Sequence, residues 1–340
     1  MRRLQTWTFL LCCAAGSTSS AQAPSSPGQA APVARSNVRP FSAAVEAARA
    51  HLDGDRGVEA LRALAAVRGR AARDLAVAAH RAMARLAELG VPLEPDAARR
   101  ASPPQQRGLA ASLATLRTWT AAHPDDALAL LIEGRALLIS GQIEEAERAL
   151  GAAASARPGD PRAWNDRAMV LVALRRLPEA ERCLEAASRL APGDPEPWSN
   201  LGAVRLARGD AAAAAEAFEH AVERAPDVAR HHSDLGSARL SQSDAAGAIR
   251  SYRRASALAP SDGVILSNLG FALSLADRLD EAESTLRRAV AAAPQSVSAW
   301  NNLGAVLARR GQRDEARACF ERALGLDAAD PRARANLQGL

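Results

Sequence analysis

The chain has 340 residues and a formal net charge of +5; 48% of its residues are hydrophobic, but only 3% are aromatic. Because many of the hydrophobic residues are alanines, the composition suits helices that pack closely through small side chains and excludes a globular core of large ones. All 43 basic residues are arginines and they form no arginine-rich block, so the composition gives no support for a nucleic-acid partner.

Residues 1–23 are predicted to be an export signal. Arg2 and Arg3 provide a positively charged start, and an apolar run follows at 7–15. This run is too short to cross a bilayer as a helix, and the small residues after it provide sites for cleavage near Ala23. We therefore expect an exported protein that is periplasmic or associated with the cell envelope.

Two cysteines within this signal, Cys12 and Cys13, leave a second interpretation open. Bacterial lipoproteins carry a lipid on a cysteine that follows small residues, whereas Leu10 and Leu11 precede this pair. Lipid attachment at Cys12 or Cys13 is the weaker alternative to simple cleavage. It would be the protein's only contact with a membrane.

Residues 24–40 are rich in proline, serine and alanine and are predicted to form a flexible linker, either a spacer or simply an unfolded mature N-terminus. Residues 41–123 are predicted to be an N-terminal helical region, whose first helices resemble a degenerate copy of the repeat described below. Within this region, 91–107 is predicted to be a loop because it carries four prolines, and 108–123 a helix that caps the array.

The rest of the chain, 124–340, is dominated by a sequence repeat. Proline recurs at a constant spacing at Pro124, Pro158, Pro192, Pro226, Pro260 and Pro294, and alanine recurs in phase with it. The predicted repeats are 127–160, 161–194, 195–228, 229–262, 263–296 and 297–330, followed by a capping helix at 331–340.

Each repeat is predicted to be a helix–turn–helix unit. In the repeat 195–228, Asp194 can cap the first helix, and Pro195 suits the first helical position. Gly209 supplies the turn, and the second helix stops at Pro226 because proline cannot continue a helix interior. Small residues then allow the two backbones to approach, and larger ones fill the space between them.

This pattern resembles the tetratricopeptide repeat family. The residues that carry the resemblance in the third repeat are Trp198, Leu201, Gly202, Ala214, Phe218, Ala221 and Pro226. The first two repeats depart from it, with Glu133-Gly134 and Arg167-Ala168 in place of Leu-Gly. The resemblance implies an all-α fold: an α-solenoid of about six repeats that forms a right-handed superhelix and binds a peptide or partner protein in its concave groove.

A polar column on the first helices is the candidate binding site. It comprises one residue of each repeat from the second onward and one of the capping helix, and a second polar run lies beside it. The column is Asp166, Asn200, Asp234, Asn268, Asn302 and Asn336, and the run beside it is Asn165, Ser199, Ser233, Ser267 and Asn301. The column resembles the asparagine ladder with which some arrays of this family hold an extended peptide, since an amide can both donate to and accept from a backbone. Arg135, Arg162, Arg230 and a pocket near Phe271 are predicted to add specificity. The alternative is that these side chains are merely solvated or satisfy local backbone groups.

Catalytic chemistry is not expected. The sequence contains no phosphate-binding glycine loop, no HExxH and no GxSxG. Cys183 and Cys319 are interpreted as small hydrophobic residues. A metal site at His220, His231 and His232 is not favoured, because adjacent residues of a helix point in different directions. We therefore predict no catalytic residue, no cofactor and no metal.

Two classes of function remain. The first is a non-enzymatic scaffold or adaptor; an array behind an export signal is also similar to bacterial pilotin-type lipoproteins, apart from its long N-terminal extension and poor lipidation signal. The second is a substrate-recruiting or regulatory subunit of an enzyme complex, in which case the catalytic domain is a separate chain. A filament that grows by end-to-end stacking is a weaker third alternative.

Overall fold

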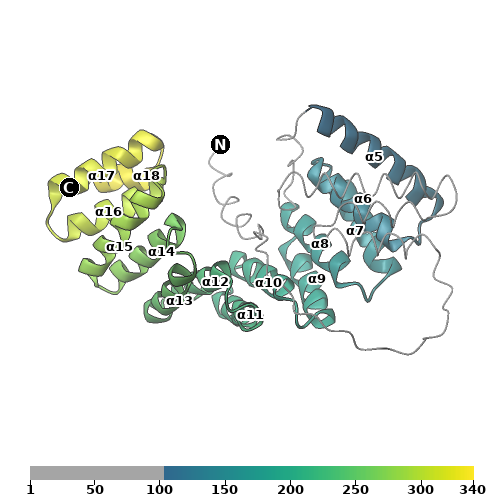
Figure 1. Ribbon diagram of the computed structural model, residues 1–340, viewed down its shortest axis with the longest axis horizontal. Coiled ribbons are helices and arrows are strands. Elements are labelled where there is room, and N and C mark those ends of the chain that lie inside the picture. The colour runs from purple at the N-terminus through teal and green to yellow at the C-terminus, as the bar shows by residue number, and fades with distance from the viewer. Residues whose placement is uncertain (1–102) are drawn as a thin grey trace, which may run out of the picture. The chain divides into compact units, whose positions relative to one another are not determined.

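The computed structural model describes residues 103–340, and every regular element in this range is an α-helix (Figure 1). The all-α prediction is therefore confirmed. The predicted export signal with Cys12 and Cys13, the linker 24–40 and the helices expected between 41 and 89 lie outside the described residues.

The chain divides into two compact units, Met1–Leu190 and Ala191–Leu340. Unit 1, where it is described, contains α5 (Pro103–Ala122), the pair α6 (Ala127–Ile139) and α7 (Ile143–Ala156), and the pair α8 (Pro161–Ala173) and α9 (Leu177–Leu190). Unit 2 contains α10 (Pro195–Ala207), α11 (Ala211–Arg224), α12 (Ala229–Ser241), α13 (Ala245–Leu258), α14 (Gly263–Leu275), α15 (Leu279–Ala292), α16 (Val297–Arg309), α17 (Arg313–Leu326) and α18 (Pro331–Gln338). The first helix of each pair is called helix A, and the second helix B.

One boundary differs from the sequence prediction. The loop expected at 91–107 ends earlier, because α5 begins at Pro103. Pro103 and Pro104 are compatible with this start, since the N–H groups of the first turn have no partner within a helix and proline costs nothing there.

Side-chain caps fix the start of nearly every helix A. The capping oxygen accepts a backbone N–H two or three residues later, as in the bond from Arg162 N to Asp160 Oδ1 at 3.1 Å. The caps recur once per repeat, at Asp126, Asp160, Asp194, Asp262, Ser296 and Asp330. Val228 occupies this position before α12 and provides no side-chain cap.

The turns inside the hairpins also share one geometry. Gly141, Gly209 and Gly311 have φ angles of 75°, 88° and 79°, in the left-handed region that glycine enters without strain. The other three hairpins place Arg175, Ser243 and Asp277 in the same conformation at the same position. The turn geometry is therefore kept even where the sequence lacks glycine.

The core of each hairpin lies where a small residue of helix A, most often glycine, meets a large side chain of helix B. A Cβ built on Gly202 would lie 2.8 Å from the ring of Phe218, and one on Gly236 would lie 2.8 Å from Tyr252. Phe218 and Tyr252 are almost fully buried, and alanines of helix B surround them. The small residue therefore sets how closely helices A and B approach.

Among residues 103–340, no helix combines the length and the apolar character that a membrane-spanning segment needs.

Candidate partner-binding face

The A helices of unit 2 contact one another in sequence order: α10 with α12, α12 with α14, α14 with α16, and α16 with α18. Their exposed sides form the surface that we call the A-helix face. Three of the predicted polar-column residues, Asn200, Asn268 and Asn302, lie on its helices together with Asp234. Asp166 lies on α8 in unit 1 and is described separately.

In unit 1, Asp166 is 2% exposed and accepts a hydrogen bond from Arg135 Nε at 2.5 Å, which links α6 to α8. A buried carboxylate is stable only when it is paired, so the arginine and the aspartate explain each other's presence. Arg162 forms two bonds with Asp160, the cap of its own helix, at 2.7 and 2.5 Å. Arg135 and Arg162, two of the three arginines that were predicted to add specificity, are thus paired with carboxylates of unit 1.

Arg230 on α12 is engaged in the same way. Its Nε lies 3.4 Å from Asp234 Oδ2 one turn along the helix, and a terminal nitrogen lies 3.3 Å from Ser199 Oγ on α10. Asp234 and Asn200 are both buried. Arg230 therefore links Asp234 of the column to Ser199 on the preceding A helix.

The polar column also joins neighbouring repeats further along unit 2. Asn302 Nδ2 donates to Ser267 Oγ at 3.2 Å, and Asn336 Nδ2 donates to Asn301 Oδ1 at 2.9 Å. Asn301 is buried, as is Asn165 at the equivalent position of α8. The partners of each bond are 35 residues apart, one more than the spacing between successive repeats. This spacing of polar residues is visible in the sequence, but the sequence analysis did not use it.

Asn268 on α14 differs from its counterparts. It is half-buried and makes no hydrogen bond with any residue between 103 and 340. The same stripe of α14 carries Val264, Phe271 and Leu275, which are 59%, 40% and 56% exposed. Sequence analysis named a pocket near Phe271 but did not identify the stripe with Val264 and Leu275, although their spacing along one helix and the absence of charge from α14 were visible.

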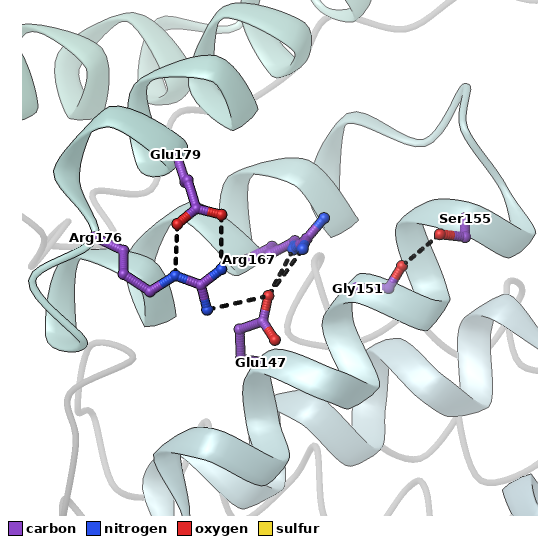
Figure 2. A network of polar contacts seen from close by, with 6 residues as sticks. All are labelled: Glu147, Gly151, Ser155, Arg167, Arg176 and Glu179. Atoms are coloured by element: carbon purple, nitrogen blue, oxygen red, sulfur yellow. Dashed lines mark hydrogen bonds and ion pairs between the residues drawn. The ribbon is translucent and has the colours of Figure 1, made fainter.

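A network of charges replaces part of the apolar core in unit 1. Figure 2 shows Arg167 of α8 bonded to Glu147 of α7, and Arg176 bonded to Glu179 of α9. Arg167 reaches Glu147 Oε1 at 2.8 Å, and a nitrogen of Arg176 lies 3.9 Å from the same oxygen. Arg167 occupies the position of Leu201 in the third repeat. In the second repeat, an arginine paired with a carboxylate therefore stands where the third repeat has a buried leucine.

The histidines and cysteines that the sequence analysis considered within the repeats lie in packed surroundings. His220 packs its ring against Trp198, at a centroid distance of 4.4 Å, and Arg224 lies over the same indole. His231 is buried, and desolvation, with smaller contributions from Arg230 and His232, lowers its pKa to about 4. Burial raises the pKa of Cys183, and it raises the pKa of Cys319 to about 11. No cluster in the described range gathers three or more metal-ligating side chains.

Helix pairs that recur at a constant spacing, with a small residue facing a large side chain in each pair, define a solenoid scaffold. Three tetratricopeptide-repeat models match the sequence: one at 137–204 and 239–309, another at 105–161 and 199–263, and a third at 297–330. Together these matches run from 105 to 330. The chain belongs to the tetratricopeptide repeat family.

Solved structures agree with this fold. The structure of Pseudomonas aeruginosa pilF matches at 16% identity with a TM-score of 0.54, over 64% of this chain and all of that one. A chain of the APC/C hetero-tetramer Cut9–Hcn1 matches at 18% identity with a TM-score of 0.54, over 88% of this chain and 62% of that one. No functionally curated protein matches the sequence. At these identities, the likeness shows the fold alone.

Proposed function

We propose that this protein is an exported, non-enzymatic scaffold of the cell envelope that holds an extended segment of a partner protein on the A-helix face of unit 2. The observation that carries the proposal is the polar column, which places half-buried amides at Asn268 and Asn302 on successive repeats. The expected export signal at 1–23 supports the envelope location.

The chemistry of the column suits backbone recognition. An amide side chain offers two donors and one acceptor oxygen, and an extended segment offers free N–H and C=O groups along its length. Each such bond contributes only about 0.5–1.5 kcal/mol net, so several contacts are needed for useful affinity. A repeat array supplies them because it presents the same position once per repeat.

Photo-crosslinking in cells that naturally make the protein tests this proposal. A photoreactive phenylalanine at Asn302 should give a discrete crosslinked product with a partner protein, whereas the same residue at Glu216, which is exposed on helix B α11, should not. Equal crosslinking at both positions, or none at either, would remove the polar column at Asn302 from the proposal. Cell fractionation with sequencing of the mature N-terminus tests the export step, and intact Met1 in the cytosol would contradict it.

Alanine at Asn200, Asn268 and Asn302 together then measures the contribution of the column. We expect the triple variant to bind the crosslinked partner at least about tenfold more weakly, which corresponds to a loss of about 1.4 kcal/mol. Because Asn302 also bonds to Ser267, the single variant Ser267→Ala is the control that removes this bond alone. Full affinity in the triple variant would mean that the polar column only serves the fold.

A further inference from the structure

The apolar stripe on α14 is the feature of unit 2 that the fold does not explain. Among residues 116–340, five large hydrophobic residues are exposed, and three of them, Val264, Phe271 and Leu275, share one side of this helix. They follow one another at intervals of seven and four positions, which keeps them on one face of a helix. Exposed apolar side chains that gather on one face mark interaction sites more often than isolated ones do.

We propose that Val264, Asn268, Phe271 and Leu275 form an anchor site for an extended, uncharged, apolar segment of the partner protein. This inference rests on the proposed function and specifies the chemistry of the segment that is bound. The four residues are called the α14 anchor below.

The amide of Asn268 distinguishes an extended segment from a helix. It lies between Val264 and Phe271 on the stripe and has no hydrogen-bond partner in the part of the chain that the structure describes. The middle of a bound helix has already satisfied its backbone groups and would leave this amide unpaired under an apolar surface, which is costly. An extended segment brings free N–H and C=O groups to the amide.

The spacing of the anchor agrees with an extended backbone. Along an α-helix, Val264 lies about 6 Å before Asn268, and Phe271 lies about 4.5 Å after it. Successive side chains of an extended chain point to opposite sides. A segment held at Asn268 can therefore direct one side chain toward Val264 and the next toward Phe271 and Leu275.

The electrostatics of the anchor exclude a charged occupant. Helix α14 contains no charged residue. Two arginines on the neighbouring A helices have carboxylate partners, Arg230 with Asp234 at 3.4 Å and Arg309 with Asp277 at 2.8 Å. A charged side chain placed on Phe271 would lose water without gaining a counter-ion, so two adjacent uncharged apolar residues are the favoured anchors.

Selection from a phage library of random nonapeptides tests this inference with the full-length protein. We expect the wild type to enrich peptides with two adjacent apolar residues and no charge beside them. Synthetic versions should bind the variants Phe271→Ser and Val264→Ser at least about tenfold more weakly, because each anchor loses its apolar contact. Leu190→Ser removes an equally exposed leucine from unit 1 and should leave the affinity unchanged.

The variant Asn268→Leu separates the two kinds of occupant. It completes the apolar stripe, so a bound helix would bind more tightly, whereas an extended segment would lose its backbone contact and bind about two- to tenfold more weakly. Tighter binding, enrichment of charged peptides or no enrichment at all would overturn the inference. So would a concentration-dependent dimer in sedimentation that Phe271→Ser abolishes, because the occupant would then be a second copy.

The same experiments keep the two proposals apart. If peptide binding is insensitive to Phe271→Ser but falls with alanine at Asn200 and Asn302, the α14 anchor is wrong and the polar column stands. If no crosslink forms at Asn302 while the peptides still require Phe271, the anchor stands and the extended column is wrong.

Discussion

The two units fill one position of the repeat with opposite chemistry and still build the same hairpin. In unit 2 the position before the glycine is a buried leucine in every repeat, at Leu201, Leu235, Leu269 and Leu303. In unit 1 it is Glu133 and Arg167. The side chain of Arg167 is partly exposed and bonds to Glu147 on the preceding helix B. The leucine therefore contributes stability to the hairpin, whereas the small residue after it and the turn set its geometry.

The network in unit 1 is a weak substitute for the leucine. The side chains of Arg176 and Glu179 are both at least about a third exposed, and that of Arg167 is 27% exposed, so water screens their attraction to the carboxylates. We therefore expect unit 1 to owe little stability to these charges.

The sharpest test exchanges the residues between the units. Leu235→Arg would bury a cation in a repeat where Ala215 stands at the position of Glu147, and should lower the free energy of unfolding by about 3–5 kcal/mol, which urea titration followed by circular dichroism can measure. A loss below about 1 kcal/mol, the usual size for a substitution outside a core, would show that the position in unit 2 is as tolerant as that in unit 1.

The reverse exchange is the control. Arg167→Leu removes only partly exposed ion pairs and adds apolar contact, so the free energy of unfolding should change by less than about 1 kcal/mol in either direction. A large loss would mean that the network shown in Figure 2 holds α7 and α8 together.

The second difference between the units is a buried histidine. His231 on α12 occupies the repeat position that Ala163 occupies on α8. It is 6% exposed, and its pKa is about 4. Because the unfolded chain binds the proton near pH 6.5, unfolding takes up a proton between pH 6.5 and 4, and the stability of unit 2 should fall as the pH falls through this window. The loss should reach about 3 kcal/mol at most.

The variant His231→Ala tests the cause, since Ala163 and Ala299 show that alanine fits this position. We expect the variant to lose most of the pH dependence between 6.5 and 4 in parallel urea titrations. An unchanged slope would assign the pH dependence to other groups.

Much of the fold followed from the sequence because its signals repeat. The prolines and the caps at Asp160, Asp194 and Asp330 recur in the same register, so each copy supports the others. The start of α5 at Pro103 did not follow, since proline marks both loops and first turns. The site was harder to predict, because a side chain such as Asn302 bonds either to a ligand or to Ser267, and the sequence does not distinguish the two.

The third test concerns the close approach that both units share. Gly202→Ala would place a Cβ 2.8 Å from the Phe218 ring, and should destabilise unit 2 by about 1–3 kcal/mol through overpacking. Unit 1 already holds Ala168 at this position of its second repeat. Gly202→Ala would therefore leave the stability unchanged only if the Phe218 ring could move aside. An unchanged midpoint and slope on urea titration would show that the ring moves.

The smallest effect is a gain in stability. Val228 precedes α12 where Asp160 precedes α8, and it leaves the first turn of α12 without a side-chain cap. Val228→Asp should place an acceptor beside those N–H groups at a residue that is already exposed, and an aspartate also interacts favourably with the positive end of the helix. We expect a gain of about 1 kcal/mol in the free energy of unfolding. The matched change Asp262→Val removes the cap of α14 and should cost a similar amount. If the loss occurs without the gain, the backbone before α12 does not allow a capping side chain, and the missing cap reflects the conformation of this loop rather than the choice of valine.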